Sequence, residues 1–569
     1  MKKALVLLIL SISLVICLAS CDQPVDHTHE FGEWSVTERP TDTKEGLQER
    51  ICSCGERESK TIAKLPAGYS VGLDYKLNED GQSYSVSGIG DCKDRVLVIT
   101  PVYDGLPVTA INRSAFAGRK NLSSVVIPDG VTSIGAGAFS GCTGLTNIEI
   151  PDSVTSIGAG AFSGCTGFAK IVIPDSIVSI GNSAFKGCKY IRDVYISDLD
   201  AWYNISFGNQ SSNPMCNGAN LHLDGKFVTD VTIPNTVTNL GNILTGCISI
   251  VSVTVPDSVT CIGDYAFYGC NGLESVVIPD SVTCIGKDAF RGCTSLESVV
   301  IPDSVTCIGE DAFRGCTGLE SLIIPDGVTT IEKSVFYCCE NLTDVVIPDS
   351  VTDIGDFAFY GCTELTGIVI PDSVTRIGQN AFRGCDSLVY NEYDNAYYLG
   401  SDFNPYLVLV KAKDTAITSC EINPNTKFML DDAFEYCTSL ASIVIPDSVV
   451  SIGYAAFRDC TGLTSVVIGD GVASIDYATF DNCTTLTSVV ISDSVASIGF
   501  GAFNNCTALT SVVIGDSVTS IDLYAFQNCD SLTNVYYTGT EAEWTEISII
   551  YGNDDLKNAT IHYNYVPAN

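Results

Sequence analysis

The chain has 569 residues, and its 67 acidic against 30 basic side chains give a formal net charge of −37 at pH 7. Because this charge repels phosphate backbones, we exclude nucleic acid as a partner. Hydrophobic residues make up 46% of the chain. This share is high for a water-soluble protein and fits an architecture in which every repeated unit contributes its own residues to the hydrophobic core.

The first 20 residues have the three parts of an export signal, which are Lys2 and Lys3, an apolar stretch over residues 4–16, and then small residues. The apolar stretch is too short for a comfortable membrane span. Residues 18–21, L-A-S-C, resemble a bacterial lipobox at all four positions. This resemblance implies a lipoprotein signal peptide, cleavage before Cys21 and lipid attachment to that residue, so that acyl chains hold the protein on a membrane. The alternative is an ordinary secretory signal followed by a chance cysteine.

A small His/Cys module follows the lipid anchor, and together they span residues 21–67. The module resembles short modules near the start of bacterial surface proteins, and it offers soft ligands in two tight pairs, H-x-H and C-x-C. Such ligands suit Zn²⁺, although this spacing is closer than in ordinary zinc sites. A redox pair of the two cysteines or a plain turn are the alternatives, so we predict no cofactor and no metal site. Four residues stay as metal candidates: His27, His29, Cys52 and Cys54.

Residues 68–112 lack the repeat but show the pattern of short strands. Tyr84 and Val86 alternate with serines, and residues 96–99 form a continuous apolar run that Pro101 closes. The open end of a solenoid exposes core and unpaired strand edges. We therefore predict a β-rich N-terminal cap over this stretch.

From residue 127 onward the sequence repeats nearly the same phrase every 23 residues, S-V-V-I-P-D-S-V-T-x-I-G-x-x-A-F-x-G-C-T-x-L. A fixed short period of this kind is typical of a solenoid, in which each unit buries its apolar side against its neighbours. The product is a long exposed surface rather than a pocket, so the pattern favours binding over catalysis. The marker isoleucines recur in three runs: Ile127, Ile150 and Ile173; Ile278, Ile301, Ile324, Ile347 and Ile370; Ile445, Ile468, Ile491 and Ile514.

One copy of the repeat indicates how each unit folds. Ile148 and Ile150 alternate at period two, which predicts a short strand with one face inward. Pro151 has no N–H to donate and ends the strand. Gly158 is expected to permit a tight bend, and Phe162 adds the largest apolar group of the coil. Stacked in register, such coils predict a parallel β-sheet along one face, with phenylalanine and isoleucine ladders inside.

The phrase I-P-D-S-V-T-x-I-G-x-x-A-F-x-G-C resembles the BspA-like branch of bacterial leucine-rich-repeat proteins, over roughly residues 72–569. This resemblance implies a right-handed leucine-rich-repeat solenoid on a cell surface, often acting in adhesion.

The 23-residue repeat is interrupted at V-Y-I-S-D-L-D-A-W…G-A-N-L-H (residues 194–222). This pattern returns as V-Y-Y-T-G-T-E-A-E-W…N-A-T-I-H (residues 535–562). A terminating module therefore occurs midway and again at the end, with two corresponding residue pairs: Trp202 with Trp544, and His222 with His562. The predicted segments are a first leucine-rich-repeat segment with its end module (113–222), a second leucine-rich-repeat segment (223–533) and a C-terminal end module (534–569).

A second break forms an insertion near residues 390–434, which we expect to protrude or to form an enlarged coil. Tyrosines crowd into it, and aromatic residues of this kind are enriched at binding hot spots. The alternative is that they pack over the altered coil. The candidate binding residues are Tyr390, Tyr393, Tyr397, Tyr398 and Tyr406.

Many of the 26 cysteines recur once per coil. Neighbouring coils bring their Cα atoms to a bridgeable distance, but side chains in register point in parallel, which is poor disulfide geometry. Because free Cys behaves as a small buried hydrophobe, we predict reduced core thiols both for this ladder and for the shorter series Cys261, Cys284 and Cys307. The main ladder contains Cys142, Cys165, Cys188, Cys247, Cys270, Cys293, Cys316, Cys339, Cys362, Cys385, Cys437, Cys460, Cys483, Cys506 and Cys529.

An aspartate also recurs in the turn of each coil. Carboxylates stacked at roughly 4.8 Å repel one another by about 1 kcal/mol per pair in water. Hydrogen bonds from turn N–H groups are the favoured compensation and bound Ca²⁺ the alternative, since one carboxylate per coil lacks the several oxygens of a calcium cage. The ladder contains Asp129, Asp152, Asp175, Asp257, Asp280, Asp303, Asp326, Asp349, Asp372, Asp447, Asp470, Asp493 and Asp516.

No motif in the sequence indicates a catalytic site. Residues 68–72 match G-x-S-x-G, but they lie in a linker, whereas a nucleophile elbow needs a strand before it and a helix after it. We therefore predict a non-enzymatic, exported, lipid-anchored protein of the bacterial cell surface or outer membrane. Its solenoid is expected to bind a host or microbial surface macromolecule, in the first place a protein, as adhesins do. The alternative is a structural spacer or a polysaccharide-binding component of a surface nutrient-uptake system, which exposed aromatic rows on the sheet face would favour.

Overall fold

The computed structural model describes residues 29–566. The chain divides into two compact units. Unit 1 runs to Ser252 and includes Tyr265–Gly272, and unit 2 contains Val253–Asp264 and the residues from Leu273 onward. The predicted signal peptide, the predicted lipid-attachment residue Cys21 and the candidate ligand His27 lie outside the described residues.

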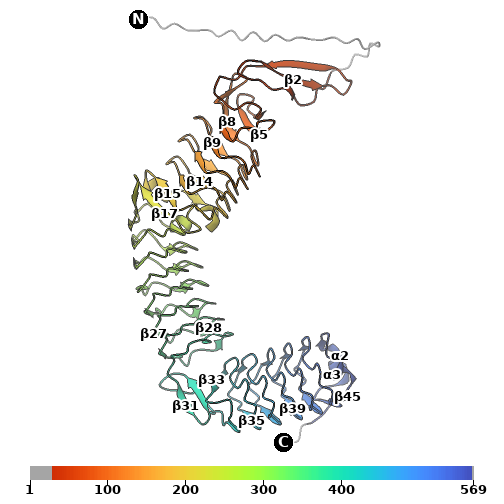
Figure 1. The fold of residues 1–569 in the computed structure, drawn as a ribbon. Helices are drawn as coiled ribbons and strands as arrows, with labels where there is room; N and C mark the ends of the chain where they lie inside the picture. The colour runs from red at the N-terminus through yellow and green to blue at the C-terminus, as the bar shows by residue number, and fades with distance from the viewer. Residues whose placement is uncertain (1–28, 567–569) are drawn as a thin grey trace. The chain divides into compact units, whose positions relative to one another are not determined.

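Most coils contribute two short strands, one to each of two series of parallel sheets, and the stacked coils can be followed in Figure 1. In unit 1, β9 (Ser124–Val126) pairs in register with β11 (Asn147–Glu149), 23 residues further along the chain. After the turn, β10 (Ser133–Ile134) pairs in the same way with β12 (Ser156–Ile157). The predicted solenoid of 23-residue coils with a parallel sheet is thus confirmed. The second sheet was not predicted, because a strand of two residues is too short to show an alternation.

In unit 1 the small module and the cap precede the coils. The module is an antiparallel sheet of β1 (Ser35–Glu38), β2 (Gly46–Ile51) and β3 (Arg57–Ile62). The predicted β-rich cap is present, and its strand β8 (Leu106–Ile111) pairs in parallel with β10, so the cap continues directly into the coil sheet. The other elements of unit 1 are β4 (Asp74–Leu77), β5 (Tyr84–Gly88), β6 (Val96–Val98), β7 (Val102–Tyr103), β13 (Lys170–Val172), β14 (Ser179–Ile180), β15 (Asp193–Ile196), α1 (Leu199–Tyr203), β16 (Ser206–Phe207), η1 (Gln210–Ser212), β17 (Asn220–Leu223), β18 (Lys226–Phe227), β19 (Asp230–Thr232) and η2 (Asn242–Leu244).

Unit 2 contains two runs of coils separated by the insertion. The insertion is an antiparallel arrangement of β31 (Asn391–Tyr393), β32 (Ala396–Leu399) and β33 (Val408–Ala412). Strand β33 then pairs in parallel with β34 (Phe428–Met429), which leads into the second run. The elements of the first run are β21 (Cys261–Ile262), β22 (Ser275–Val277), β23 (Cys284–Ile285), β24 (Cys307–Ile308), β25 (Ser321–Ile323), β26 (Thr330–Ile331), β27 (Asp344–Val346), β28 (Asp353–Ile354), β29 (Gly367–Ile368) and β30 (Arg376–Ile377), while β20 (Ser252–Thr254) spans the sequence boundary between the units.

The second run of unit 2 continues to the end of the described chain. Its strands pair in parallel and in register, as β35 (Ser442–Ile445) does with β37 (Ser465–Ile468). The elements are β35 (Ser442–Ile445), β36 (Ser451–Ile452), β37 (Ser465–Ile468), β38 (Ser474–Ile475), β39 (Ser488–Ile491), β40 (Ser497–Ile498), β41 (Ser511–Ile514), β42 (Ser520–Ile521), β43 (Asn534–Tyr537), α2 (Glu541–Glu546), β44 (Ser548–Ile549), α3 (Asp554–Asn558) and β45 (Thr560–His562).

Identical side chains stack in the core of each unit. The rings of Phe139 and Phe162 lie 5.5 Å apart and nearly parallel in unit 1, and those of Phe290 and Phe313 lie 5.2 Å apart in unit 2. All fifteen cysteines of the main ladder are buried beside these rings. The predicted phenylalanine ladder and the burial of the main cysteine ladder are therefore confirmed.

A buried S–H···O bond joins twelve of these cysteines to the coil before them. The Sγ–H of Cys165 donates to the backbone carbonyl of Phe139 at 3.0 Å. Burial raises the pKa of the Cys316 thiol to about 12, so the thiol keeps the proton that it donates. The same bond, between residues 26 apart, starts from Cys142, Cys188, Cys270, Cys316, Cys339, Cys362, Cys385, Cys460, Cys483, Cys506 and Cys529.

Gly158 is needed for a different reason from the one the sequence suggested. Its φ lies outside the left-handed region, so no bend requires glycine there. A Cβ at this position would instead lie 2.5 Å from the backbone nitrogen of Ala136 in the preceding coil. The predicted turn is present, since the amide of Ala161 donates to the carbonyl of Gly158 at 3.1 Å. Glycine is required there because it lets two coils approach closely.

The same close approach in unit 2 gives a direct test of how tightly the coils stack. At Gly355 a Cβ would lie 2.7 Å from the backbone nitrogen of Lys333, whereas at Gly367 the nearest atom would be 3.9 Å away. We expect Gly355→Ala to lower the free energy of unfolding by about 1–3 kcal/mol, because backbone cannot move aside as a flexible side chain does. Gly367→Ala is the matched control and should stay within about 0.5 kcal/mol of the parent. Chemical denaturation measures both, and equal effects would contradict the close-packed stack.

Candidate functional site

The strands that carry the S-V-V-I phrase form the main sheet of the coils, and in unit 2 the outer face of this sheet carries a row of exposed aliphatic side chains. Its members occupy the second valine position of the S-V-V-I phrase, which the strand alternation turns outward while the flanking residues face the core. Val277 is 62% exposed and Val300 is 79% exposed, and the two are direct partners across neighbouring coils. The valine row contains Val277, Val300, Ile323, Val346, Val369, Val444, Val467 and Val490.

Acidic and small polar side chains border the valine row. Glu274 and Ser275 precede Val277 and are both exposed, and the exposed turn residue Asp280 follows it. The sequence pattern did not single out the exposed valines that lie beside these polar residues. An apolar row rimmed by polar groups is typical of a protein-interaction surface.

Some members of the aspartate ladder bind the turn of the next coil. The carboxylate of Asp447 accepts a hydrogen bond from the amide of Asp470 at 3.1 Å. The carboxylate of Asp493 accepts one from the amide of Asp516 at 3.2 Å and another from the hydroxyl of Thr538 at 2.8 Å. Capping by turn N–H groups is therefore confirmed for Asp447 and Asp493, and these bonds offset part of the repulsion between neighbouring carboxylates.

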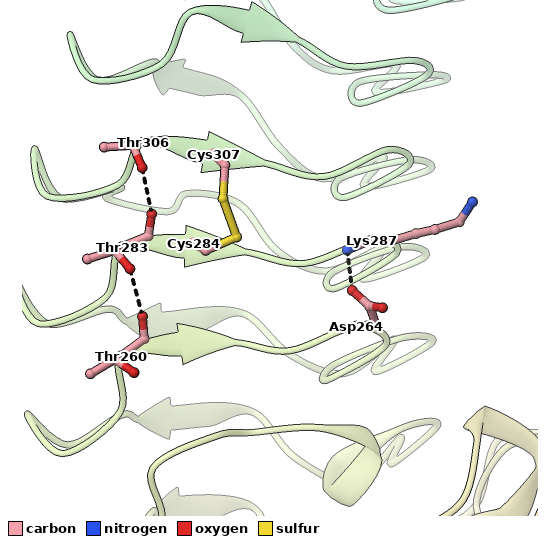
Figure 2. Close-up of a disulfide and its surroundings, with 7 residues drawn as sticks. All are labelled: Thr260, Asp264, Thr283, Cys284, Lys287, Thr306 and Cys307. Atoms are coloured by element: carbon pink, nitrogen blue, oxygen red, sulfur yellow. Dashed lines mark hydrogen bonds between the residues drawn. A yellow bond between two sulfur atoms is a disulfide. The ribbon is translucent and has the colours of Figure 1, made fainter.

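Cys284 and Cys307 form a disulfide, which corrects the prediction of reduced core thiols for the shorter series (Figure 2). The two residues are in-register partners of β23 and β24, and their Cα atoms lie 4.9 Å apart. They belong to the second sheet and are not buried, so their side chains can turn toward each other as core side chains cannot. Cys261 is a half-buried free thiol on the preceding coil.

Hydroxyl groups join the same coils beside the disulfide. Thr283 donates to the carbonyl of Thr260 at 3.2 Å, and Thr306 donates to the carbonyl of Thr283 at 3.4 Å (Figure 2). The amide of Lys287 donates to Asp264 at 2.8 Å. The surface of this run is thus held by covalent and polar links between successive coils.

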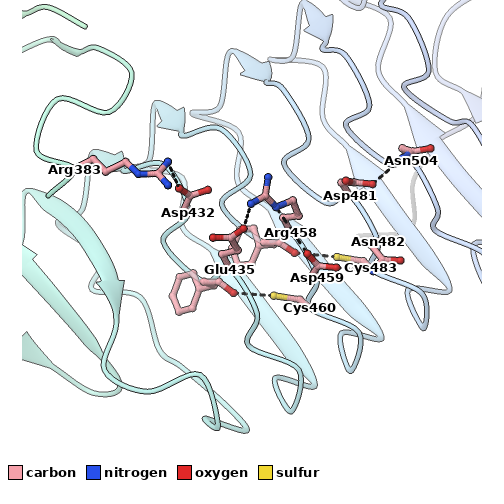
Figure 3. Close-up of polar contacts among 12 residues, drawn as sticks. Arg383, Asp432, Glu435, Arg458, Asp459, Cys460, Asp481, Asn482, Cys483 and Asn504 are labelled. Atoms are coloured by element: carbon pink, nitrogen blue, oxygen red, sulfur yellow. Dashed lines mark hydrogen bonds and ion pairs between the residues drawn. The ribbon is translucent and has the colours of Figure 1, made fainter. Parts of the chain in front are cut away.

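A polar ridge follows the turns of the second run, starting at the insertion (Figure 3). Its contacts are between residues of neighbouring coils: Arg383 with Asp432 at 3.0 Å, Arg458 with Glu435, Asn482 with Asp459 at 2.5 Å, and Asn504 with Asp481 at 2.9 Å. Ion pairs that keep contact with solvent, such as Arg383 with Asp432, contribute little stability. The charges of this ridge are paired with one another.

The tyrosines of the insertion divide into two groups. Tyr398 is fully buried, and Tyr393 and Tyr406 pack against the same core. The alternative that these residues pack over the altered coil is correct for these three, and the prediction of a binding surface at Tyr398 was wrong.

Tyr390 and Tyr397 form the second group and are only half-buried. Their rings lie 5.3 Å apart, and Lys411 and Lys413 approach the ring of Tyr390 and of Tyr397, respectively. Lys413 also pairs with Glu392 at 2.6 Å. A role of Tyr390 and Tyr397 in binding stays a prediction.

An acidic cavity of about 210 Å³ lies beside the insertion in unit 2. Its lining includes Asp431 and Asp476, and burial raises the pKa of both carboxyl groups. Asp431 accepts hydrogen bonds from the amides of Asn380 and Tyr454, which lie on the coils at either side of it. Asp476 accepts one from the hydroxyl of Ser474 at 3.0 Å. The cavity therefore holds two carboxylates whose ionisation the fold opposes.

The raised pKa of Asp476 predicts that the stability of the fold depends on pH. Burial raises the pKa of Asp476 in the folded state, so its ionisation opposes folding. This residue therefore lowers the free energy of unfolding at pH values above the unfolded pKa of about 3.9. Below that pH the carboxyl group is protonated in both states and the effect disappears. We expect Asp476→Asn to raise the melting temperature at pH 7 relative to the parent and to change it less near pH 3, since Asn keeps the acceptor for Ser474. Asp470→Asn, at an exposed ladder position, is the control and should show no such difference. A loss of stability at pH 7 in Asp476→Asn would contradict this assignment.

The midway and terminal end modules share one local structure. In the first, His222 lies opposite Tyr195 across the strands, and their rings stack at 4.5 Å. In the second, His562 lies opposite Tyr536, and their rings stack at 4.8 Å. The predicted correspondence of the two histidines is confirmed. His222 is buried and hydrogen-bonded to Asp193 at 2.8 Å, which gives it a structural role.

Three of the four candidate metal ligands lie in the described chain, and the structure brings them together. The ligand atoms of His29, Cys52 and Cys54 all lie within 4.8 Å of one another. The amide of Cys54 lowers the pKa of the Cys52 thiol to about 6.

The class of protein follows from comparison with known families. The family model described as the BspA type leucine rich repeat region matches residues 109–213, 223–328, 283–401 and 413–548, and the chain belongs to this family. No curated protein matches the chain.

Solved structures similar to this chain come from several bacteria. A leucine rich cell surface protein from Faecalibacterium prausnitzii A2-165 is 26% identical, with 84% of this chain and 96% of that chain covered and a TM-score of 0.30. A leucine-rich repeat protein from Bacteroides ovatus ATCC 8483 is 23% identical, with 86% and 98% covered and a TM-score of 0.28. The pneumococcal vaccine antigen PcpA is 20% identical, with 59% and 89% covered and a TM-score of 0.33.

Across residues 29–566, no helix has the length and apolar character needed to cross a bilayer.

Proposed function

We propose that this protein is a lipid-anchored, non-enzymatic binding protein of the bacterial cell surface, which uses the outer face of its main sheet to bind a protein ligand as adhesins do. The observation that carries the proposal is the valine row. Its aliphatic side chains are exposed in both runs of unit 2, although the chain has ample polar residues to cover that face.

The charge of the chain defines the chemistry of the ligand. The acidic residues Glu274 and Asp280 flank the row at Val277, and the whole chain carries a net charge of −37. A protein with an apolar strip bordered by Lys or Arg complements this face, and charge complementarity would speed its encounter with the chain.

The alternative of a polysaccharide-binding component has less support. Sugar rings stack on free aromatic faces, whereas the aromatic rows of this chain pack ring against ring. Tyr337 and Tyr360 stack at 4.9 Å, and Tyr477 and Phe500 stack at 5.3 Å. These rows lie outside the valine row.

Binding of the purified full chain to immobilised fibronectin, laminin and collagen, beside a glycan array, tests the proposal. We expect saturable binding to at least one protein, with an affinity that falls as salt rises. Replacing Val277, Val300 and Ile323 together with Ser should weaken that affinity about tenfold or more, because each substitution removes about 1 kcal/mol of apolar burial at the interface.

Val178→Ser is the matched control for this experiment. Val178 is 62% exposed, as Val277 is, but it lies outside the main-sheet row. Its substitution should leave binding unchanged, and both variants should melt with the parent. Binding to glycans alone, or equal losses in the row variant and the control, would contradict the proposal.

A further inference from the structure

Three soft ligand atoms converge at the hairpin loop between β2 and β3 of the small module. The Nδ1 atom of His29 lies 3.2 Å from the Sγ atom of Cys54, and the Sγ atom of Cys52 completes a set in which all separations are within 4.8 Å. In a tetrahedral zinc site, bond lengths of about 2.3 Å to sulfur and about 2.0 Å to nitrogen place the sulfurs about 3.8 Å apart and sulfur about 3.5 Å from nitrogen. Small rotations of the side chains are enough to close this set around one ion.

The backbone fixes the two cysteines in this arrangement. The amide of Cys52 donates to the carbonyl of Glu56 at 2.8 Å, and the amide of Gly55 donates to the carbonyl of Cys52 at 2.8 Å. Gly55 has a φ of 93°, which a side chain would strain. The loop is therefore a tight turn that holds both sulfurs at one end of the hairpin.

His29 reaches the loop from a separate segment. Phe31 forms an antiparallel bridge with Cys52, and the amide of Gly32 donates to the carbonyl of Ile51 at 3.1 Å. This pairing runs the segment alongside β2 and places the imidazole over the turn. The ligands thus come from two segments that are 25 residues apart in the sequence.

We propose that His29, Cys52 and Cys54 bind one Zn²⁺ ion, with a water molecule in the fourth position. Two thiolates and a neutral imidazole balance the charge of the ion. The chemistry of the ligand set favours zinc over Ca²⁺ or Mg²⁺, which take oxygen ligands.

By coordinating residues from both, the ion would link the segment that carries His29 to the hairpin of β2 and β3. Strand β1 is exposed along its whole length and the sheet has only three strands, so the module has little core of its own. Metal binding supplies folding free energy to small modules of this kind. The site therefore stiffens the module through which the chain leaves its predicted lipid anchor.

Titration of the reduced full chain with Co²⁺ and Zn²⁺ tests the proposal. We expect thiolate-to-cobalt charge-transfer bands that Zn²⁺ abolishes, and one tightly held zinc per chain by elemental analysis. His29→Ala, Cys52→Ser and Cys54→Ser should each weaken zinc binding at least about tenfold. Cys338→Ser, which changes a half-buried thiol outside the cluster, is the control and should bind as the parent does.

Circular dichroism of each variant checks that the coils, which dominate the spectrum, stay folded when the site is lost. Absence of the charge-transfer bands in the reduced parent chain would overturn the proposal. So would zinc binding to Cys52→Ser/Cys54→Ser with the affinity of the parent, or binding of Cu(I) without binding of Zn²⁺.

Discussion

Stacking of coils in register is the constraint on which the rest of this structure depends. A residue and its counterpart 23 positions later occupy the same environment, so a side chain that fills the core in one coil must be met by the same kind in the next. The parallel rings of Phe139 and Phe162 and the buried bond from Cys165 to Phe139 follow directly. Cysteine suits this position because it is small, apolar and able to donate one weak hydrogen bond to a carbonyl that has a lone pair to spare.

The same constraint creates the surface that we propose as the binding face. Once Val276 and Ile278 point inward, Val277 must point outward, and the repetition of the phrase turns one exposed valine into a row. In the first run of unit 2, the disulfide between Cys284 and Cys307 and the hydrogen bonds from threonine hydroxyls beside it link the successive coils that carry the valine row. Binding energy on such a surface is spread along many equivalent positions rather than concentrated in a pocket.

Much of the fold could be predicted from the sequence, because period and alternation are local properties. The strand at Ile148, the cap and the buried cysteine ladder needed only residue spacing. The role of Gly158 could not be predicted, since it depends on the backbone of another coil. The burial of Tyr398 depends on how the insertion folds back, and the disulfide depends on which sheet face carries Cys284. The sequence supplied the pairs of metal candidates, but only the structure shows that His29 meets both cysteines.

Deletion of one whole coil tests the register constraint most directly. Removal of residues 461–483 takes out one 23-residue period and lets Thr484 follow Cys460 as Thr461 does in the parent. We expect this chain to keep the circular dichroism of the parent per residue and to unfold within a few degrees of it, whereas removal of residues 461–471 alone should unfold the second run. Equal disruption by both deletions would contradict the account, because it would show that the coils are not interchangeable units.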